Sequence, residues 1–144
     1  MAGRPRKKVA GSKKVKPSGP VPCAVLWGLD PSSEKGAAVR AVLKETGVVA
    51  HTVLPERLGD PVGAFARLPG FRPAVVPYAG QEPAAEEFVL LCGLSDAQVN
   101  EFLARSREAG CVVGAKALLT KANRAWPLVQ LISAVAAEHA QLAE

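Results

Sequence analysis

The sequence predicts an α/β domain built as a tandem repeat, in which each copy runs strand, helix, strand, helix. Three observations support this prediction. Apolar runs of strand length alternate with segments of helical period, the pattern of the first half returns in the second, and 144 residues suit one domain. We expect a single domain over residues 21–144, made of repeats 24–69 and 88–139 that a proline-rich connector joins.

The first repeat begins with a continuous apolar run at 24–29, which indicates a buried strand. Asp30 followed by Pro31 predicts the start of a helix, because aspartate caps the first turn and proline fits its first position. Gly47 predicts the end of that helix. The second strand and a short return helix are expected at 48–54 and 62–68.

The second repeat shows the same order of elements after the connector at 70–87. Residues 88–91 are apolar, Ser95 and Gln98 have the spacing of a capping box, and Gly110 predicts the end of the helix. A strand at 111–119 and a last helix that reaches residue 139 complete this repeat.

The expected sheet has four strands in the order 2-1-3-4, with helices packed on it. The first and third strands are apolar at every position, which is typical of central strands covered on both faces. The second and fourth carry His51 and Lys116 at matching positions of the repeat, as expected of edge strands, where polar side chains hinder pairing with other molecules. The return helix at 62–68 favours a parallel arrangement of the two halves. The turns at 28–30 and 93–95 would then lie side by side, at the edge where open α/β sheets bind ligands. Asp30 and Asp96 already place negative charge there, so structural capping of the two helices is the favoured interpretation.

Residues 1–20 are rich in Lys, Arg, Gly, Ser and Pro and contain no acid, so we expect a disordered basic tail. This tail accounts for the formal net charge of +5 and leaves the rest of the chain slightly acidic. Two roles are open for it, a solvated extension or nonspecific contact with the phosphates of nucleic acid. The candidate nucleic-acid contacts are Arg4, Arg6, Lys7, Lys8, Lys13, Lys14 and Lys16.

Several classes of protein are excluded by composition. No apolar run approaches the roughly 20 residues of a membrane span, and no apolar segment follows the basic N-terminus, so we expect a cytoplasmic protein without a membrane partner. The three cysteines, Cys23, Cys92 and Cys111, are far apart in the sequence, and no two of them form a C-x-x-C motif. This spacing gives no indication of a disulfide framework or of a zinc site. The histidines, His51 and His139, are too few for a metal site, and no glycine-rich phosphate loop is present. We therefore expect no metal and no cofactor.

Cys92 and Lys116 are the candidates for catalysis. Cys92 ends the third strand just before a helix N-terminus, where a thiol pKa is lowered and a nucleophile would be well placed. The equivalent position of the first repeat is Trp27, and neither histidine is a convincing base, so a core cysteine is the favoured interpretation. Lys116 is either a ligand cation or an edge residue, and His51 at the matching position favours the edge role.

The loop at 120–126 is the most informative, because it combines hydrogen-bond donors, cations and an aromatic residue. In the functional interpretation, Thr120, Asn123 and Trp126 contact a carboxylate, a phosphate or a ring. In the structural interpretation, Thr120 and Asn123 bond the backbone of the turn, and Trp126 packs on the core. The equivalent segment of the first repeat, 55–61, has none of these side chains.

The second repeat also carries a family resemblance, through Cys92-Gly93, the helix 96–108, the run Lys116-Ala117-Leu118-Leu119-Thr120, Asn123 and Trp126. These residues resemble the bacterial domain-of-unknown-function family 3783. The first half is similar at 61–63 and 70–71, so the resemblance extends over nearly everything after Pro20. Leu94 and Lys121 depart from the family pattern, which has phenylalanine and proline there. The resemblance implies no assigned activity.

The first hypothesis is a non-catalytic α/β binding or regulatory module whose partner is an unknown small molecule or protein. Its candidate contacts are Thr120, Asn123, Trp126, Lys116, Gly93 and Ser95. One alternative is an enzyme of unknown reaction that uses Cys92 or Lys116. The other is nonspecific association with nucleic acid through the basic tail.

Overall fold

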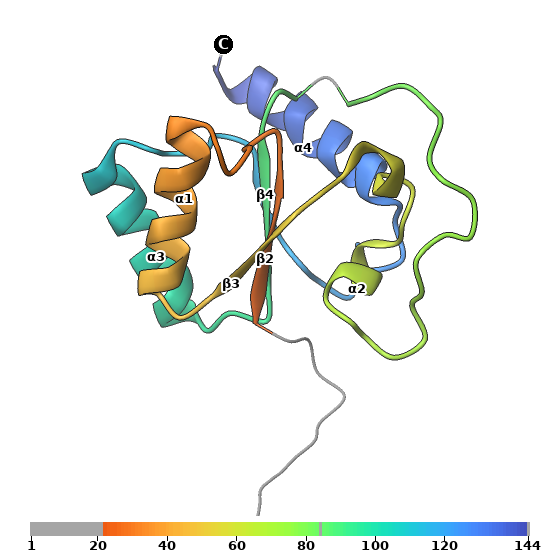
Figure 1. Cartoon of the computed structure of the whole chain (residues 1–144), viewed down its shortest axis with the longest axis horizontal. Helices are drawn as coiled ribbons and strands as arrows, with labels where there is room; N and C mark the ends of the chain where they lie inside the picture. Colours follow the sequence, from red (N-terminus) through yellow and green to blue (C-terminus); the bar gives the residue numbers. More distant parts are fainter. Residues whose placement is uncertain (1–21, 84, 144) are drawn as a thin grey trace, which may run out of the picture.

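The computed structural model describes residues 22–83 and 85–143, so the predicted basic tail lies outside the described residues. The elements alternate between strands and helices, as the repeat predicts (Figure 1). The strands are β2 (Cys23–Trp27), β3 (Val49–Thr52), β4 (Phe88–Cys92) and β5 (Lys116–Leu118). The helices are α1 (Glu34–Glu45), the 3₁₀ turn η2 (Pro55–Arg57), α2 (Val62–Phe65), α3 (Asp96–Ala109) and α4 (Leu128–Ala143).

The four strands form one sheet in the order β3-β2-β4-β5, which confirms the predicted order and the predicted edges. Within each repeat the two strands are parallel, as predicted. The central strands β2 and β4, however, are antiparallel, so the sheet is mixed. The expectation that the two halves run parallel is therefore wrong.

The register of the central pair shows how the two repeats are related in space. Val25 lies opposite Leu90 in the middle of the pair, Cys23 lies opposite Cys92 at one end, and Trp27 lies opposite Phe88 at the other. Exchanging the two repeats maps the Val25–Leu90 pair onto itself and interchanges the two end pairs of the ladder. The repeats are thus related by an approximate two-fold axis through the centre of the sheet.

A second set of contacts obeys the same symmetry. Pro61 and Pro127 form an isolated antiparallel bridge where the return helices α2 and α4 begin. The N–H of Val62 donates to the carbonyl of Trp126 at 2.8 Å, and the N–H of Leu128 donates to the carbonyl of Asp60 at 2.9 Å. These reciprocal bonds satisfy free N–H groups at the start of each helix, and they need the two copies to approach in opposite directions.

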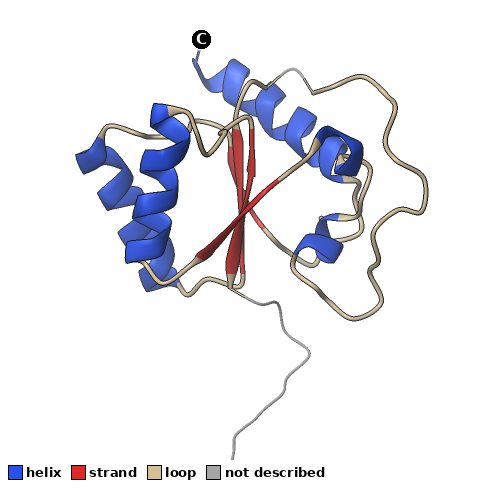
Figure 2. Ribbon diagram, in the orientation of Figure 1, coloured by secondary structure: helices blue, strands red, loops and turns tan. Residues whose placement is uncertain are grey.

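The helices cover both faces of the sheet. α1 and α3 pack on one face, and α2 and α4 pack on the other, which gives three layers (Figures 1 and 2). Alternate residues of β2 point to opposite layers, with Ala24 and Leu26 toward α1 and α3, and Cys23 and Val25 toward α2 and α4. Burial on both faces explains why the central strands have no polar position.

The helix boundaries differ from the prediction in two places. α1 begins at Glu34, and its cap is Ser33, whose hydroxyl accepts from the N–H of Gly36 at 3.0 Å. Asp30 instead accepts hydrogen bonds from the N–H and hydroxyl of Ser32, so its carboxylate closes a turn before the helix. α2 ends at Phe65, earlier than expected. The predicted capping box of α3 is confirmed.

In the ranges 22–83 and 85–143, no helix is both long enough and apolar enough to cross a membrane.

Candidate functional site

The glycine turns that follow the central strands lie at opposite ends of the sheet. Gly28 follows Trp27, which pairs with Phe88, whereas Gly93 follows Cys92, which pairs with Cys23. The expectation that these turns lie side by side is wrong, because it required parallel central strands. Gly93 has a φ of 71°, and Ser95 caps α3 by accepting from the N–H of Gln98 at 3.1 Å.

The loop at 120–126 uses its polar side chains on its own backbone. The amide oxygen of Asn123 accepts from the N–H of Thr120 at 2.9 Å, and the amide nitrogen of Asn123 donates to the carbonyl of Leu118 at 3.0 Å. In return, the hydroxyl of Thr120 accepts from the N–H of Asn123 at 3.2 Å. Asn123 is buried, and Trp126 is partly buried and packs against the core cluster on the α2 and α4 side of the sheet. These contacts favour the structural interpretation of the loop.

His51 and Lys116 do not occupy equivalent positions. The ladders pair Val25 with His51 but Leu90 with Ala117, so the equivalent of His51 is Ala117. A shift of one residue turns a side chain to the other face of a strand, and His51 therefore faces the α2 layer while Lys116 faces the α3 layer. The prediction that His51 and Lys116 occupy matching positions of the repeat is therefore wrong. The prediction that both residues lie on edge strands is confirmed.

Lys116 lies at a small apolar pocket of about 160 Å³ that is also lined by Phe102 and Ser106. Its ammonium group donates to the carbonyl of Val113, and partial burial lowers its pKa from the ordinary lysine value. The Ser106 hydroxyl is buried and has no hydrogen-bond partner among the described residues. Lys116 thus has an internal partner, which agrees with a structural role.

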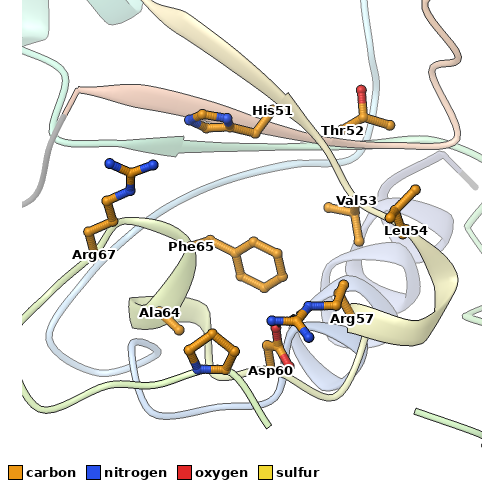
Figure 3. A pocket seen from close by; sticks show the side chains of 10 residues that line it. His51, Thr52, Val53, Leu54, Arg57, Asp60, Ala64, Phe65 and Arg67 are labelled. Carbon is orange, nitrogen blue, oxygen red and sulfur yellow. Dashed lines mark ion pairs between the residues drawn. The ribbon is translucent and has the colours of Figure 1, made fainter. Parts of the chain in front are cut away.

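A different pocket, between β3 and α2, brings charged side chains together. Its volume is about 260 Å³, and its lining comes from the end of β3, from η2 and from the α2 region. The full lining is His51, Thr52, Val53, Leu54, Arg57, Asp60, Ala64, Phe65, Arg67 and Pro73. In Figure 3 the Phe65 ring lies in the middle, His51 and Arg67 lie at one end, and Arg57 lies with Asp60 at the other.

The cations of this pocket differ in how far their charge is compensated. Arg57 pairs with Asp60 at 3.0 Å, and the Asp60 carboxylate also accepts from the N–H of Ala74 at 2.8 Å. Arg67 is exposed and forms no ion pair with any residue in 22–83 or 85–143. The Arg67 end of the pocket is therefore positive.

The backbone of Arg67 is unusual. Its φ is 59°, and the other residues with positive φ in the described chain are all glycines. Arg67 follows α2 in a Schellman motif, in which the N–H of Leu68 donates to the carbonyl of Gly63 at 3.0 Å. α1 ends in the same way: the N–H of Val48 donates to the carbonyl of Leu43 at 2.9 Å, and the residue of positive φ is Gly47.

Sequence reasoning missed this pocket for two reasons. The end of α2 was expected after residue 68, so the αL position at Arg67 was not recognised. In addition, His51 and Arg67 come from different elements, and only the packing of α2 beside β3 brings them together. Sequence reasoning also treated Cys23 as an isolated cysteine, although it lies opposite Cys92 in the central pair.

A family model matches the second repeat of the chain. Residues 87–142 match the family model described as domain of unknown function (DUF3783), so the chain carries a DUF3783 domain from the start of β4 into α4. This confirms the resemblance in the second repeat, whereas the resemblance in the first repeat stays a prediction. The searches among curated proteins and among solved structures found no match. Among the described residues, no group of three or more His, Cys, Asp or Glu side chains could hold a metal ion.

Proposed function

We propose that this chain, whose second repeat is a DUF3783 domain, is a binding module for small organic anions, which it holds in the pocket between β3 and α2. The proposal keeps the binding-module class but moves the site from the loop at 120–126 to the α2 region. The loop is less well suited, because Thr120 and Asn123 already bond its own backbone.

The observation that carries the proposal is the arginine at the end of α2. Three helices of the described chain end in a residue of positive φ, and α1 and α3 use Gly47 and Gly110 there, whereas α2 uses Arg67. A side chain in the left-handed region costs about 1 kcal/mol relative to glycine. A contribution to binding explains why the chain keeps a cation at a position that favours glycine.

The chemistry of the lining indicates the class of ligand. Arg67 offers a planar fork of donors that suits a carboxylate or a phosphate, and His51 lies at the same end of the pocket. The Phe65 ring offers an apolar surface to the body of the ligand. The volume of about 260 Å³ is slightly smaller than that of pockets for drug-sized molecules, about 300 Å³ or more, so the ligand should be small.

The proposal is tested by isothermal titration calorimetry with pairs of small compounds. Each pair contains a carboxylate or phosphate ester and the neutral amide or alcohol of the same shape. We expect several anions to bind and their neutral partners to fail. In Arg67→Gln, which keeps a side chain at the same φ, we expect affinity to fall by about tenfold or more, because one charged contact is lost.

The matched control is Arg72→Gln, which removes an exposed arginine outside the pocket and should leave affinity unchanged. The proposal is wrong if no anion in the series binds wild-type protein. It is equally wrong if Arg67→Gln and wild type bind the same anions with the same affinity.

A further inference from the structure

We propose that Cys23 and Cys92 form a redox-active dithiol, which closes to an internal disulfide by exchange with a small-molecule disulfide. This site differs from the anion pocket, and the inference does not depend on the function proposed for that pocket.

The register of the central strands places the two thiols together. Cys23 begins β2 and Cys92 ends β4, and they are directly opposite each other in the antiparallel ladder. Both side chains point to the α2 and α4 layer. Opposite residues of such strands have Cα atoms about 4.5 to 5.5 Å apart, inside the roughly 4.4 to 6.8 Å range found in disulfides. Both cysteines are free and buried.

The surroundings distinguish the two thiols. The S–H of Cys92 donates to the sulfur of Cys23, which lowers the pKa of Cys23. Burial opposes this shift, and the positive charge of Arg67 adds to it, so the pKa of Cys23 lies below its ordinary value. The same interaction raises the pKa of Cys92, and burial raises it further. Cys23 is therefore suited to be the attacking thiolate, and Cys92 is suited to be the thiol that resolves the mixed disulfide.

The exchange takes place in two steps. The thiolate of Cys23 attacks one sulfur of the small disulfide, forms a mixed disulfide and releases the first small thiolate. Cys92 then gives its proton to that thiolate or to water, attacks the sulfur of Cys23 and releases the second small thiolate. The two protein thiols are oxidised to one disulfide, and the small disulfide is reduced to two thiols.

Access to the buried pair depends on its place at the end of the sheet. Cys92 is followed by the exposed Gly93, and Cys23 is preceded by the exposed Pro22. On the layer side, the S–H of Cys23 donates to the carbonyl of Phe65, 3.9 Å away, in the four-residue helix α2. Strand ends and single helical turns are the segments that open most easily, so the reagent can enter without global unfolding.

The third cysteine provides a control within the chain. Cys111 is also free and buried, but it packs in the opposite layer, against α1 and α3. The sheet separates it from the pair, so Cys111 should form no disulfide with either partner in the folded protein.

The experiment treats reduced full-length protein with hydroxyethyl disulfide at neutral pH and follows the intact mass. We expect the protein to lose two hydrogen atoms without retaining the reagent, and non-reducing peptide mapping should join the Cys23 and Cys92 peptides. Cys111→Ser should react in the same way. Cys92→Ala should stop at a mixed disulfide on Cys23, and this step should be slower than in Cys92→Ser, whose hydroxyl can still donate.

Three results would overturn the inference. One is a stable mixed disulfide on Cys23 of the wild-type protein, which would show that Cys92 cannot resolve it. The second is a disulfide that contains Cys111. The third is no reaction in the folded wild-type protein under conditions in which the urea-unfolded chain forms the disulfide.

Discussion

At the scale of single residues, Arg67 and Asn123 show how side chains and backbone conformation are connected in this protein. Arg67 has a backbone conformation that favours glycine, and its guanidinium lies at a pocket. Asn123 is buried, and its side chain joins two backbone groups of its own loop. We expect the backbone conformation of Arg67 to lower stability and the bonds of Asn123 to raise it, and of the two side chains only Arg67 presents a charge at a pocket.

Arg67→Gly should raise the free energy of unfolding by about 1 kcal/mol, because glycine adopts positive φ without steric cost. Urea denaturation measures the change. The reverse substitution, Gly47→Arg, places an arginine in the same motif after α1, where a Cβ atom meets nothing within 4 Å. It should lower stability by a similar amount. Equal stability of Arg67→Gly and wild type would contradict the argument that Arg67 is retained for its side chain.

Asn123→Ala should lower the free energy of unfolding by about 2 kcal/mol, because it leaves the buried polar groups around the loop without partners. Chemical denaturation monitored by circular dichroism is the measurement. Lys121→Ala, at an exposed residue of the same loop, should change stability by less than about 0.5 kcal/mol. A small effect of Asn123→Ala would restore the loop as the better candidate for ligand contact.

Lys116→Met should change the pH dependence of stability. Burial lowers the folded-state pKa of Lys116, so the unfolded chain binds more protons between the folded and unfolded pKa values, and wild-type stability rises with pH there. The stability of Lys116→Met relative to wild type should therefore be highest near neutral pH and fall as pH approaches the ordinary lysine pKa of about 10.4. Thermal unfolding from pH 7 to 10 measures it, and a pH-independent difference would contradict it.

At the scale of elements, local signals account for most starts and ends. The capping box of α3 and the glycines after α1 and α3 act within a few residues of chain, so the sequence alone reveals them. The start of α1 was misplaced because Asp30, Ser32 and Ser33 can each cap a helix, and local pattern does not choose between them. The structure shows Asp30 closing the preceding turn and Ser33 capping the helix.

Ser95→Ala should lower the free energy of unfolding by about 1 kcal/mol, because the N–H of Gln98 in the first turn of α3 loses the hydroxyl that accepts its hydrogen bond. The comparison is Ser133→Ala, which changes an exposed serine inside α4 and should be nearly neutral. Denaturant titration of both variants provides the measurement. Similar effects of the two substitutions would mean that the capping box contributes little.

At the scale of the whole molecule, the approximate two-fold axis determines the arrangement of the elements. It runs through the centre of the β2 and β4 pair, and the bridge between Pro61 and Pro127 obeys the same symmetry. The axis places the two glycine turns at opposite ends of the sheet and brings Cys23 to Cys92. The family match covers one of the two copies that the axis relates.

The symmetry predicts the behaviour of one repeat alone. A fragment of residues 87–142 exposes the apolar edge of β4 that β2 covers in the full chain, and a second fragment can cover it with Leu90 opposite Leu90. We expect a folded homodimer by analytical ultracentrifugation and circular dichroism. Leu90→Lys should prevent dimer formation in the fragment. A folded monomer of the wild-type fragment would show that the central pair is not needed to complete one repeat.

The sequence by itself determined the elements, their repeat, the central and edge strands and the family of the second half, because apolar period, capping residues and glycine stops act over short distances. Only the tertiary structure decided the antiparallel centre, the pocket at Arg67 and the thiol pair. Strand direction depends on how the long connector at 70–87 places the second copy, and a connector of that length permits either direction. The reciprocal bonds around Pro61 and Pro127 exist only after the two copies pack together, so no local pattern encodes them.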